Sequence, residues 1–581
     1  MSTDYFAIVD GPDGLDANFV AQTEAILRPL GIRRHDVHPT SALFMTHNTP
    51  SLSIQGMGTI LGHVFSQTGR AIVAASQFPR LQSPAQFRQH LIRHCWGPYL
   101  LFQPADGEEG LTVMREPSPS GDMPCFYSIE KGRGFITSDI SLAELLGLYR
   151  RRIDWDAIHH RLSFPQVKSA RTTLACIREL LPGCTLHQKG DNTSVRSAWS
   201  PWDFVATDQR HVDPQEAARD IRTAVMSSVQ ALASNDKSLL LELSGGLDSS
   251  IVGACLPGSA ARVACTSLTT EVPGADEHRY ATQIADQLGV KLHAEILHLE
   301  DALFDFPIHP RCLVPRIGVL QNAVDEIMLA AAGRHGVHSF FSGGGGDTVF
   351  CSLDTAAPAA DAFRECGIRG GFGAVRNLAA LHQCTLWKAA RLALRKLRTP
   401  SGISRLPDGS FLEGRLATPL CEAHPWDATP PDSMAGDRER IRGLATCQAY
   451  RDSLARGTQK PMRMPLLSQP VVEACLRTPT WMWISEGRNR AVARAAFADL
   501  LPPDIRNRRS KGTFMSYLGA VYQRNRNRIR EFLLEGRLQE RGLLDAEALD
   551  SFLRRDLPER GHPFMRVFDI CMVENWVRHQ R

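Results

Sequence analysis

Short apolar runs separated by Gly, Pro and Asp fill the first two hundred residues. They include YFAIVD, AIVAAS, YLLFQ, LTVMRE and FITSD. Runs of this length, broken by turn residues, predict β-strands, so we expect residues 1–205 to form a mostly β domain with some helix. Between residues 181 and 204 a proline-glycine turn leads into polar sequence interrupted by aromatic residues. This stretch predicts a domain boundary near residue 205, with a second domain over residues 206–581.

After that boundary the pattern changes to a strand followed by a helix, repeated. The apolar run SLLLEL at 238–243 predicts a buried parallel strand, and ARVACTSL, KLHAEILHL and HSFF predict three more. One of the helices between them places Tyr280, Ile284 and Leu288 on a single stripe and ends at Gly289. The alternation predicts an α/β fold with a right-handed parallel sheet, whose ligands bind at the carboxyl ends of the strands.

The stretch from residue 356 to 429 has a different composition, rich in Ala, Arg, Gly and Pro. It predicts helices separated by a loop. The basic residues of LWKAARLALRKLRTP form either a solvated helix face, which is the commoner case, or a peptide-docking face. From Arg440 onward the pattern is strongly helical, with no internal repeat.

Composition limits the class of protein. The chain has 581 residues, several times the ~100–200 residues of an ordinary domain. Apolar residues make up 43% and charged residues 22%, which excludes the disordered and fibrous classes. The net charge of +4 gives no electrostatic case for a dedicated nucleic-acid or membrane-surface protein. A small molecule or a peptide is therefore the expected partner.

Lysine and cysteine usage adds to this picture. Of the 66 basic residues 57 are Arg and nine are Lys, so each Lys is easier to assess. The 14 Cys include no CxxC pair and no metal-like spacing with His, which favours small buried side chains in a reducing compartment and no zinc site. The N-terminus lacks a signal-peptide pattern, and no apolar stretch reaches the ~18 residues that span a bilayer. We expect a soluble, cytoplasmic protein.

The strongest chemical signal is the loop SGGLDSS at 244–250, between a buried strand and a helix. Its glycines let successive backbone N–H groups converge, and the helix N-terminus adds a positive dipole end. Such a loop binds a pyrophosphate, and Asp248 adds a carboxylate where Mg²⁺ would neutralise phosphate oxygens. The loop does not match the Walker pattern GxxxxGK[ST]. The expected binding residues are Ser244, Gly245, Gly246, Asp248, Ser249 and Ser250.

A second glycine loop, FSGGGGD at 341–347, closes a later strand of the same predicted sheet. Alone, four glycines are equally well a flexible loop. Because the carboxyl ends of parallel strands lie at one edge, Asp347 can face Asp248 there and complete a Mg²⁺ site for a nucleotide triphosphate.

At this point the chain resembles a known family. SGGLDSS, ADEHRYATQIADQLG, SGGGGD and LPPDIRNRRSKGTF together resemble the synthetase domain of the asparagine synthetase family, an ATP pyrophosphatase (HUP-like) fold. MREPSPSGDMPCFYSIEKGRGFITSD and TTLACIRELLPGCTL are similar to the family's N-terminal glutaminase-like (Ntn-type) α/β sandwich and its connection. The resemblance covers nearly the whole chain and is more specific in the synthetase part.

Two departures from the family pattern narrow the function. The glutamine-hydrolysing members need a Cys directly after the initiator Met, whereas this chain has Ser2, and its nearest Cys is Cys95. A retained but inactive N-terminal domain is therefore favoured over a Ser2 nucleophile. In the second loop, two Glu residues of asparagine synthetases are replaced by Gly344 and Thr348. These losses are typical of the branch that uses an amine already present on its substrate.

Within that branch, the sequence from 464 to 514, with HPW at 424–426, is most similar to the lasso peptide macrolactam synthetases of proteobacteria. The resemblance implies that ATP and Mg²⁺ serve to adenylate an Asp or Glu side chain of a short core peptide. The N-terminal amine then closes a macrolactam, with release of AMP and pyrophosphate. The implied partners are a ribosomally made, leader-cleaved precursor peptide, a leader peptidase and a leader-recognition protein, with no nucleic acid and no membrane.

The resemblance also assigns residues. Lys511 matches the family lysine that reaches the adenylate, where a cation stabilises developing negative charge; a surface lysine is the alternative. By position, Leu243 and Ser267 are expected to hold adenine and ribose, with Ser342 and Gly343 opposite them, and Gly344 is also expected to contact the nucleotide. Glu277 fits a helix-start motif and is equally well a cap or structural carboxylate. A phosphate or peptide contact is the less favoured role for three arginines: Arg488, Arg490 and Arg494.

Two rival functions remain open. The first is a β-lactam-type, carbapenam-type or asparagine synthetase-like ligase that acts on a small amino acid. The second is an inactive scaffold that binds a precursor peptide or a protease. The presence of Asp248, Asp347 and Lys511 argues against the scaffold.

Overall fold

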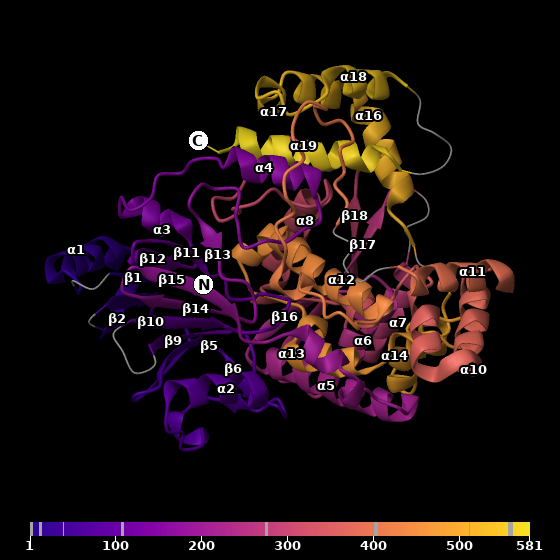
Figure 1. Ribbon diagram of the computed structural model, residues 1–581, viewed down its shortest axis with the longest axis horizontal. Coiled ribbons are helices and arrows are strands. Elements are labelled where there is room, and N and C mark those ends of the chain that lie inside the picture. The colour runs from indigo at the N-terminus through magenta and orange to yellow at the C-terminus, as the bar shows by residue number, and fades with distance from the viewer. Residues whose placement is uncertain are drawn as a thin grey trace.

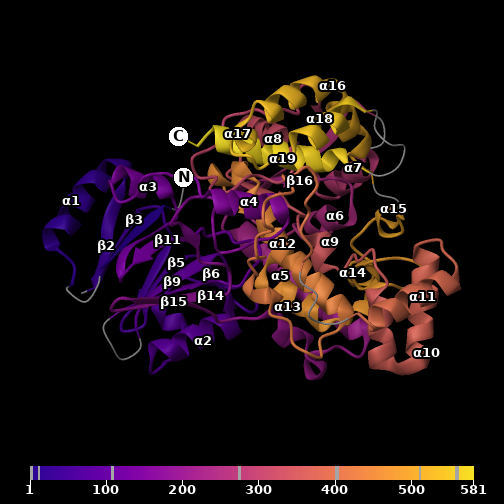
Figure 2. The ribbon, with the colours of Figure 1, turned by 45° about the horizontal axis from the view of Figure 1, so that its top comes forward.

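The computed structural model describes residues 4–10, 14–38, 40–105, 110–272, 277–399, 405–509, 512–555 and 562–580. In Figures 1 and 2 an N-terminal part built on antiparallel sheets lies beside a C-terminal part with one parallel sheet and many helices. The α/β fold class expected from the sequence is confirmed.

Two six-stranded antiparallel sheets form the N-terminal part. The first has the order β13 (Arg178–Glu179), β11 (Phe126–Glu130), β12 (Arg133–Thr137), β1 (Tyr5–Val9), β3 (Ser41–Thr46), β2 (Ile32–His38). The second has the order β15 (Asn192–Ser197), β14 (Cys184–Lys189), β10 (Leu111–Arg115), β9 (Tyr99–Pro104), β5 (Gly58–Gly62), β4 (Ser51–Ile54). A smaller sheet contains β7 (Ala71–Ile72), β6 (Val64–Ser66) and β8 (Cys95–Trp96).

Strand β1 shows how these sheets pack. Tyr5, Ala7 and Val9 enter the core between the two large sheets, whereas Phe6 and Ile8 enter a second core on the outer face. Because successive side chains point to opposite faces, a strand covered on both sides is apolar throughout. The outer faces are covered by α1 (Ala17–Leu27), α3 (Ile140–Leu145) and α4 (Trp155–Ser163) on the first sheet and by α2 (Pro84–His94) on the second.

The parallel sheet has the strand order β18 (Leu292–Leu297), β17 (Arg262–Thr270), β16 (Ser238–Glu242), β19 (Ser339–Ser342), β20 (Met462–Arg463). From β16 the chain proceeds to β17 and β18 on one side, then returns to β19 on the other. The gap between β16 and β19 is therefore the topological switch point, where ligands bind in open α/β sheets. The four predicted strands are confirmed, and only the two-residue β20 was not predicted.

Helices surround this sheet. They are α5 (Pro214–Ser234), α6 (Leu247–Ala254), α7 (His278–Gln287), α8 (Gln321–His335), α9 (Gly346–Val349), α10 (Ala357–Leu381), α11 (Leu386–Leu397), α12 (Ala435–Asp452), α13 (Gln469–Arg477), α14 (Ala491–Ala496), α15 (Pro503–Arg506), α16 (Met515–Leu534), α17 (Arg537–Glu540), α18 (Ala546–Arg554) and α19 (Phe564–Arg578). Short 3₁₀ helices are η1 (Arg28–Leu30), η2 (Ala75–Gln77), η3 (Pro201–Val205), η4 (Thr207–Gln209), η5 (Pro425–Asp427), η6 (Ala455–Thr458), η7 (Pro465–Leu467) and η8 (Thr480–Trp483). Within the described ranges, none of the helices combines the length and apolar character needed to cross a bilayer.

The two parts are joined by a common core and by buried charges. Phe6 of β1 and Trp576 of α19 belong to the same hydrophobic core. Nearby, the Lys168 ammonium pairs with Glu179 and Asp452, and Arg115 Nη1 donates to Glu179 Oε1 at 2.7 Å. Burial alone would raise the pKa of Glu179, but Lys168 and Arg115 together hold it below its ordinary value. These contacts fix the N-terminal sandwich against the C-terminal part.

The HPW motif lies in the core beside this boundary. The indole N–H of Trp202 donates to the Trp426 carbonyl at 2.8 Å, and the Trp199 and Trp426 rings are 5.4 Å apart. His424 Nδ1 accepts from the Trp426 backbone, and burial lowers the pKa of His424 to about 4. The motif therefore holds the segment after β15 against the C-terminal part through uncharged side chains.

Candidate active site

Both glycine loops lie at the switch point. The first follows β16 and enters α6, and the second follows β19 and enters α9. Because Glu242 of β16 pairs with Ser342 of β19, the loops begin at the same level of the sheet. They line a cavity of about 760 Å³. Eight of the predicted residues are brought to its wall: Leu243, Ser244, Asp248, Ser249, Ser342, Gly343, Gly344 and Asp347.

The glycines allow the two loops to touch. A Cβ on Gly343 would lie 2.4 Å from the Ser249 backbone nitrogen, and one on Gly346 would lie 2.4 Å from Asp248 Cγ. No side chain fits at those distances, so glycine is required for the second loop to reach the start of α6. Part of the glycine pattern therefore reflects backbone packing between the loops.

The two carboxylates converge as predicted, around an arginine. Arg490 Nη1 donates to Asp248 Oδ1 at 3.0 Å and Oδ2 at 2.9 Å, and to Asp347 Oδ1 at 2.7 Å. Asp248 is buried, whereas Asp347 is half exposed towards the cavity. Arg490 has a positive φ of 54°, a conformation that non-glycine residues rarely adopt. A single positive centre therefore lies within hydrogen-bonding distance of both carboxylates.

Asp248 and Asp347 could act as Mg²⁺ ligands if the Arg490 guanidinium, which lies between them, moved aside. Three carboxylate oxygens surround one cationic nitrogen, and Mg²⁺ is bound in proteins by one or two carboxylates together with substrate phosphates and water. Among the described residues no group of three or more His, Cys, Asp and Glu could hold a metal. Asp248 and Asp347 would thus hold an ion that is shared with a phosphate ligand.

The segment that carries Arg490 is held in place by its neighbours. Arg488 Nη1 donates to Asn507 Oδ1 at 2.9 Å, and Arg494 Nε donates to the Asn489 carbonyl at 3.0 Å. Burial and the charge of Arg490 lower the pKa of Arg494 to about 10. Of the three arginines considered from the sequence, Arg490 alone contacts the two aspartates, while the contacts of Arg488 and Arg494 position its segment.

Glu277 connects the first loop to the segment that contains Lys511. Arg508 Nη2 donates to Glu277 Oε1 at 2.6 Å, the Gly512 backbone N–H donates to the same oxygen, and Arg508 Nη1 donates to the Gly245 carbonyl at 3.2 Å. Glu277 makes no side-chain cap on α7, so it is a structural carboxylate. Gly512 and Phe514 line the cavity. Lys511 itself lies outside the described residues.

Four predicted binding residues are not part of the cavity wall. These residues are Gly245, Gly246, Ser250 and Ser267. Ser250 is completely buried, and on β17 it is Thr266 that lines the cavity. In the loop itself, the Ser244 and Ser249 hydroxyls are 3.1 Å apart and bond to each other. The loop hydroxyls therefore brace the turn.

The sequence of the chain is also related to known proteins. The asparagine synthase family model matches residues 220–578, more than half of the chain. The chain belongs to the asparagine synthase family.

The chain is similar, at low sequence identity, to a curated protein and to solved structures. Asparagine synthetase [glutamine-hydrolyzing] 1 of Bacillus subtilis is 22% identical over 236 residues, which are 39% of this chain and 36% of that protein. The chain thus matches about a third of that relative's length. Among solved structures, a glutamine PRPP amidotransferase from B. subtilis is 10% identical, with a TM-score of 0.22, and covers 52% of this chain and 83% of its own. An allosteric regulatory enzyme of purine biosynthesis is 11% identical, with a TM-score of 0.18, over 53% of this chain and 76% of its own. At these TM-scores the likeness carries no weight for the fold.

The far side of the cavity in this asparagine synthase family member was not anticipated from the sequence. Arg456 donates to Glu242 Oε1 and to Asp325 Oδ1, both at 2.5 Å, and is buried beside Tyr450. The adjoining wall is apolar: Leu268, Leu320, Val324 and Met328. These residues come from separate elements, so no motif marks them. The one available signal was Glu242, the single polar residue in the run SLLLEL.

The three buried cysteines of the sandwich do not replace the nucleophile of glutamine-hydrolysing family members. Burial raises the pKa of Cys95 to about 12 and the pKa values of Cys125 and Cys184 to about 11. These three thiols stay protonated at neutral pH and are poor nucleophiles. Ser2 lies outside the described residues.

Proposed function

We propose that this chain is an ATP-dependent, AMP-forming amide ligase that closes a macrolactam in a core peptide. The observation that carries the proposal is the convergence of Asp248 and Asp347 on one cationic centre between the two glycine loops. Two strand ends, a helix start and a pair of carboxylates provide what a nucleotide triphosphate requires. Membership of the asparagine synthase family supports the same chemistry.

The proposed reaction has two steps. A carboxylate oxygen of a peptide Asp or Glu attacks the α-phosphorus of ATP, and the bond from that phosphorus to pyrophosphate breaks. The N-terminal amine then attacks the acyl carbon, the bond to AMP breaks, and the amine loses a proton. One amide forms, with release of AMP and pyrophosphate.

The residues of the chain bind, orient and exclude water. Asp248 and Asp347 would hold Mg²⁺, which neutralises phosphate charge when bound. The loop backbone and the start of α6 would bind the phosphates, while Glu277 accepts from Arg508 and from the Gly512 N–H, and Arg508 donates to the Gly245 carbonyl of the first loop. The apolar wall of Leu268, Leu320, Val324 and Met328 keeps water from the acyl-adenylate.

We prefer macrolactam closure over asparagine formation because three residues of the glutamine-hydrolysing asparagine synthetases are replaced in this chain. Gly344 and Thr348 stand where asparagine synthetases carry Glu, and Ser2 stands in place of the Cys nucleophile. The atom nearest to a Cβ added at Gly344 would be Met464 Cε, at 3.2 Å. The nearest neighbour of this position is therefore an apolar side chain. The proposal includes a cytoplasmic location and a ribosomally made, leader-cleaved precursor, with a leader peptidase and a leader-recognition protein as partners. A ligase acting on a small amino acid is the alternative.

The direct test is product analysis by mass spectrometry. The purified chain is incubated with ATP, Mg²⁺ and synthetic peptides that have a free N-terminal amine and one internal Asp or Glu. We expect a product lighter by one water, together with one AMP for each ring, and no product from N-acetylated peptides. Cyclisation without AMP, or equal amide formation with free small amino acids, would contradict the proposal.

A further inference from the structure

Helix α11 buries small residues and exposes most of its large apolar residues. It faces its neighbours through Ala389 and Ala393, which are buried, and leaves its large apolar side chains in solvent. Leu386 is 58% exposed and Trp387 is 79% exposed, and Leu392 and Leu394 are exposed as well. An amphipathic helix normally buries its bulky apolar residues and exposes small or polar ones. The outer face of α11 therefore lacks the partner that its composition calls for.

Helix α10 adds to the same surface feature. Ile368 is 72% exposed and Phe372, one turn later, is 63% exposed. In Figures 1 and 2 the α10–α11 hairpin lies at the edge of the molecule opposite the N-terminal sandwich. No residue from 357 to 399 lines the cavity between the glycine loops. The hairpin surface is thus separate from the candidate active site.

The exposed charge on this hairpin has one sign. Seven basic residues are exposed: Arg364, Arg369, Arg376, Lys388, Arg391, Arg395 and Arg398. The hairpin has two acidic residues, of which Asp361 is buried and Glu365 is half-buried and bonded to Arg210 and Trp481. Along α11, Arg391 lies one turn from both Trp387 and Leu394, so basic and apolar side chains are neighbours on the outer face.

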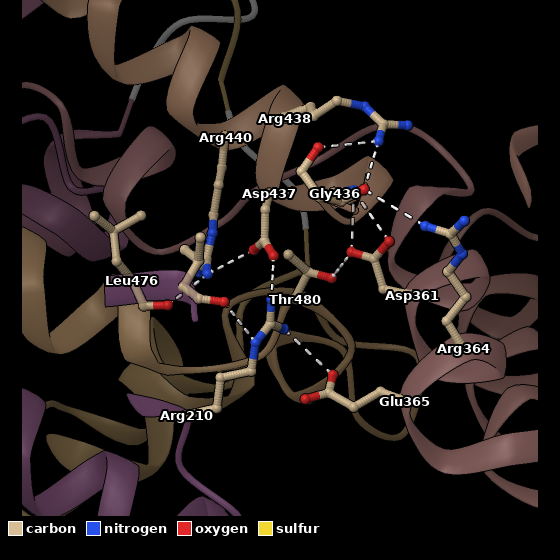
Figure 3. A network of polar contacts seen from close by, with 12 residues as sticks. Arg210, Asp361, Arg364, Glu365, Gly436, Asp437, Arg438, Arg440, Leu476 and Thr480 are labelled. Atoms are coloured by element: carbon tan, nitrogen blue, oxygen red, sulfur yellow. Dashed lines mark hydrogen bonds and ion pairs between the residues drawn. The ribbon is translucent and has the colours of Figure 1, made fainter. Parts of the chain in front are cut away.

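A cleft at the base of the hairpin is also lined by basic residues. It has a volume of about 200 Å³ and is lined by Arg364, Lys396, Arg398 and Arg438, next to the start of α12. Figure 3 shows Arg364 and Arg438 beside Asp361, whose carboxylate accepts from the Gly436 N–H at 3.0 Å and from Thr480 Oγ1 at 2.5 Å. The one carboxylate in the wall is already bonded within the protein. Lys396 is paired with Glu439, so the three guanidinium groups of Arg364, Arg398 and Arg438, with the N-terminus of α12, favour an anionic side chain.

We propose that the α10–α11 hairpin docks a separate protein that presents an acidic surface with apolar side chains. The complementary charges favour association, and Trp387 is the kind of exposed aromatic anchor that carries binding energy at interfaces. A second copy of the same face is disfavoured because two strongly basic surfaces repel. A membrane is disfavoured because Leu392 of α11 lies between Lys388 and Arg395, and Phe372 of α10 lies between Arg369 and Arg376, so the exposed apolar side chains are not confined to one face.

The test uses the full-length chain and a defined acidic probe, a fluorescent random copolymer of Glu and Tyr. Fluorescence anisotropy should show binding that weakens steeply with added salt. Two variants address the two components: Arg391→Glu with Arg395→Glu, and Trp387→Ser with Leu394→Ser. We expect each to weaken binding at least tenfold. The matched control, Arg80→Glu with Arg93→Glu, reverses two exposed charges in the sandwich and should bind as wild type does.

Several results would overturn the assignment. Equal loss of binding in the control variant would make the effect one of overall charge. Binding of wild type to phosphatidylserine vesicles but not to the copolymer would assign the face to a membrane. A higher KM for a cyclisation substrate in the hairpin variants would assign it to the substrate peptide. Circular dichroism and thermal unfolding of every variant verify that the fold is unchanged, which these exposed positions permit.

Discussion

At the residue scale, Lys511 is the cation that the family resemblance assigns to the adenylate. Nearby in the sequence, Gly512 and Arg508 both donate to Glu277, Arg508 also donates to the Gly245 carbonyl of the first glycine loop, and Phe514 lines the cavity. An ammonium there matters most where charge accumulates, during pyrophosphate departure and amine attack, and less for ground-state ATP.

We therefore expect Lys511→Ala to keep ATP affinity within a few-fold while macrolactam formation falls by roughly 10²–10³. Lys511→Arg should rescue poorly, since a planar guanidinium does not reproduce a compact ammonium. ATP affinity is measured by calorimetry and ring closure by loss of one water from the peptide mass. Near-normal cyclisation by the alanine variant would return Lys511 to the role of a surface residue.

At the element scale, the approach of the second glycine loop to α6 determines the geometry of the site. Gly343→Ala would place a Cβ 2.4 Å from backbone and should destabilise the fold by about 1–3 kcal/mol while weakening ATP binding. The matched control is Gly373→Ala in α10, where a Cβ meets nothing within 4 Å. That change should be neutral or stabilising, because alanine favours helix. Chemical denaturation measures both, and equal stability of the two variants would refute the steric account.

A second prediction at this scale concerns the polar network between α10, α12 and η8 in Figure 3. Burial and the nearby Asp437 raise the pKa of Asp361 to about 7. The folded chain then keeps a proton that the unfolded chain has released, so this contribution to stability is complete below an ordinary Asp pKa of ~4 and is lost as the pH rises to about 7.

Asp361→Asn removes that titration but keeps an acceptor for the Gly436 N–H. Thermal unfolding midpoints between pH 4 and 8 should show the advantage of wild type over the variant decreasing as the pH rises. A constant difference across the range would mean that Asp361 titrates normally.

At the scale of the whole molecule, the sandwich is fixed to the C-terminal part by a common core and by the Lys168–Asp452 pair. Its buried thiols are poor nucleophiles. We predict no glutaminase activity, and no asparagine from aspartate with glutamine or ammonia. Isotope-labelled aspartate measures this, with a glutamine-hydrolysing asparagine synthetase as positive control. Labelled asparagine at a useful rate would overturn the branch assignment.

The sequence was most informative where local pattern and fold agree. The buried run at 238–243 and the glycine loops after it predicted the central strands and the meeting of Asp248 with Asp347, because strand order follows from the alternation of elements. The sequence could not reveal Arg490 between them, because that contact depends on a strained backbone 143 residues beyond Asp347. Arg456 and the apolar wall come together only through packing. Likewise, the basic residues of α11 were predicted. That the helix buries alanines and exposes its large apolar side chains could not be predicted, because it depends on how the hairpin packs.

The measurement that tests the central claim most directly is ATP–pyrophosphate exchange. Labelled pyrophosphate is incubated with the chain, ATP, Mg²⁺ and N-acetylated peptides bearing one Asp or Glu, which can be activated but not cyclised. The account predicts peptide-dependent transfer of label into ATP by wild type, none by Asp248→Asn or Asp347→Asn, and full transfer by the exposed control Asp286→Asn, with all four chains equally folded. Undiminished exchange in either site variant, or none in wild type with any acidic peptide that the chain cyclises in its free-amine form, would contradict an adenylating ligase built on these two aspartates.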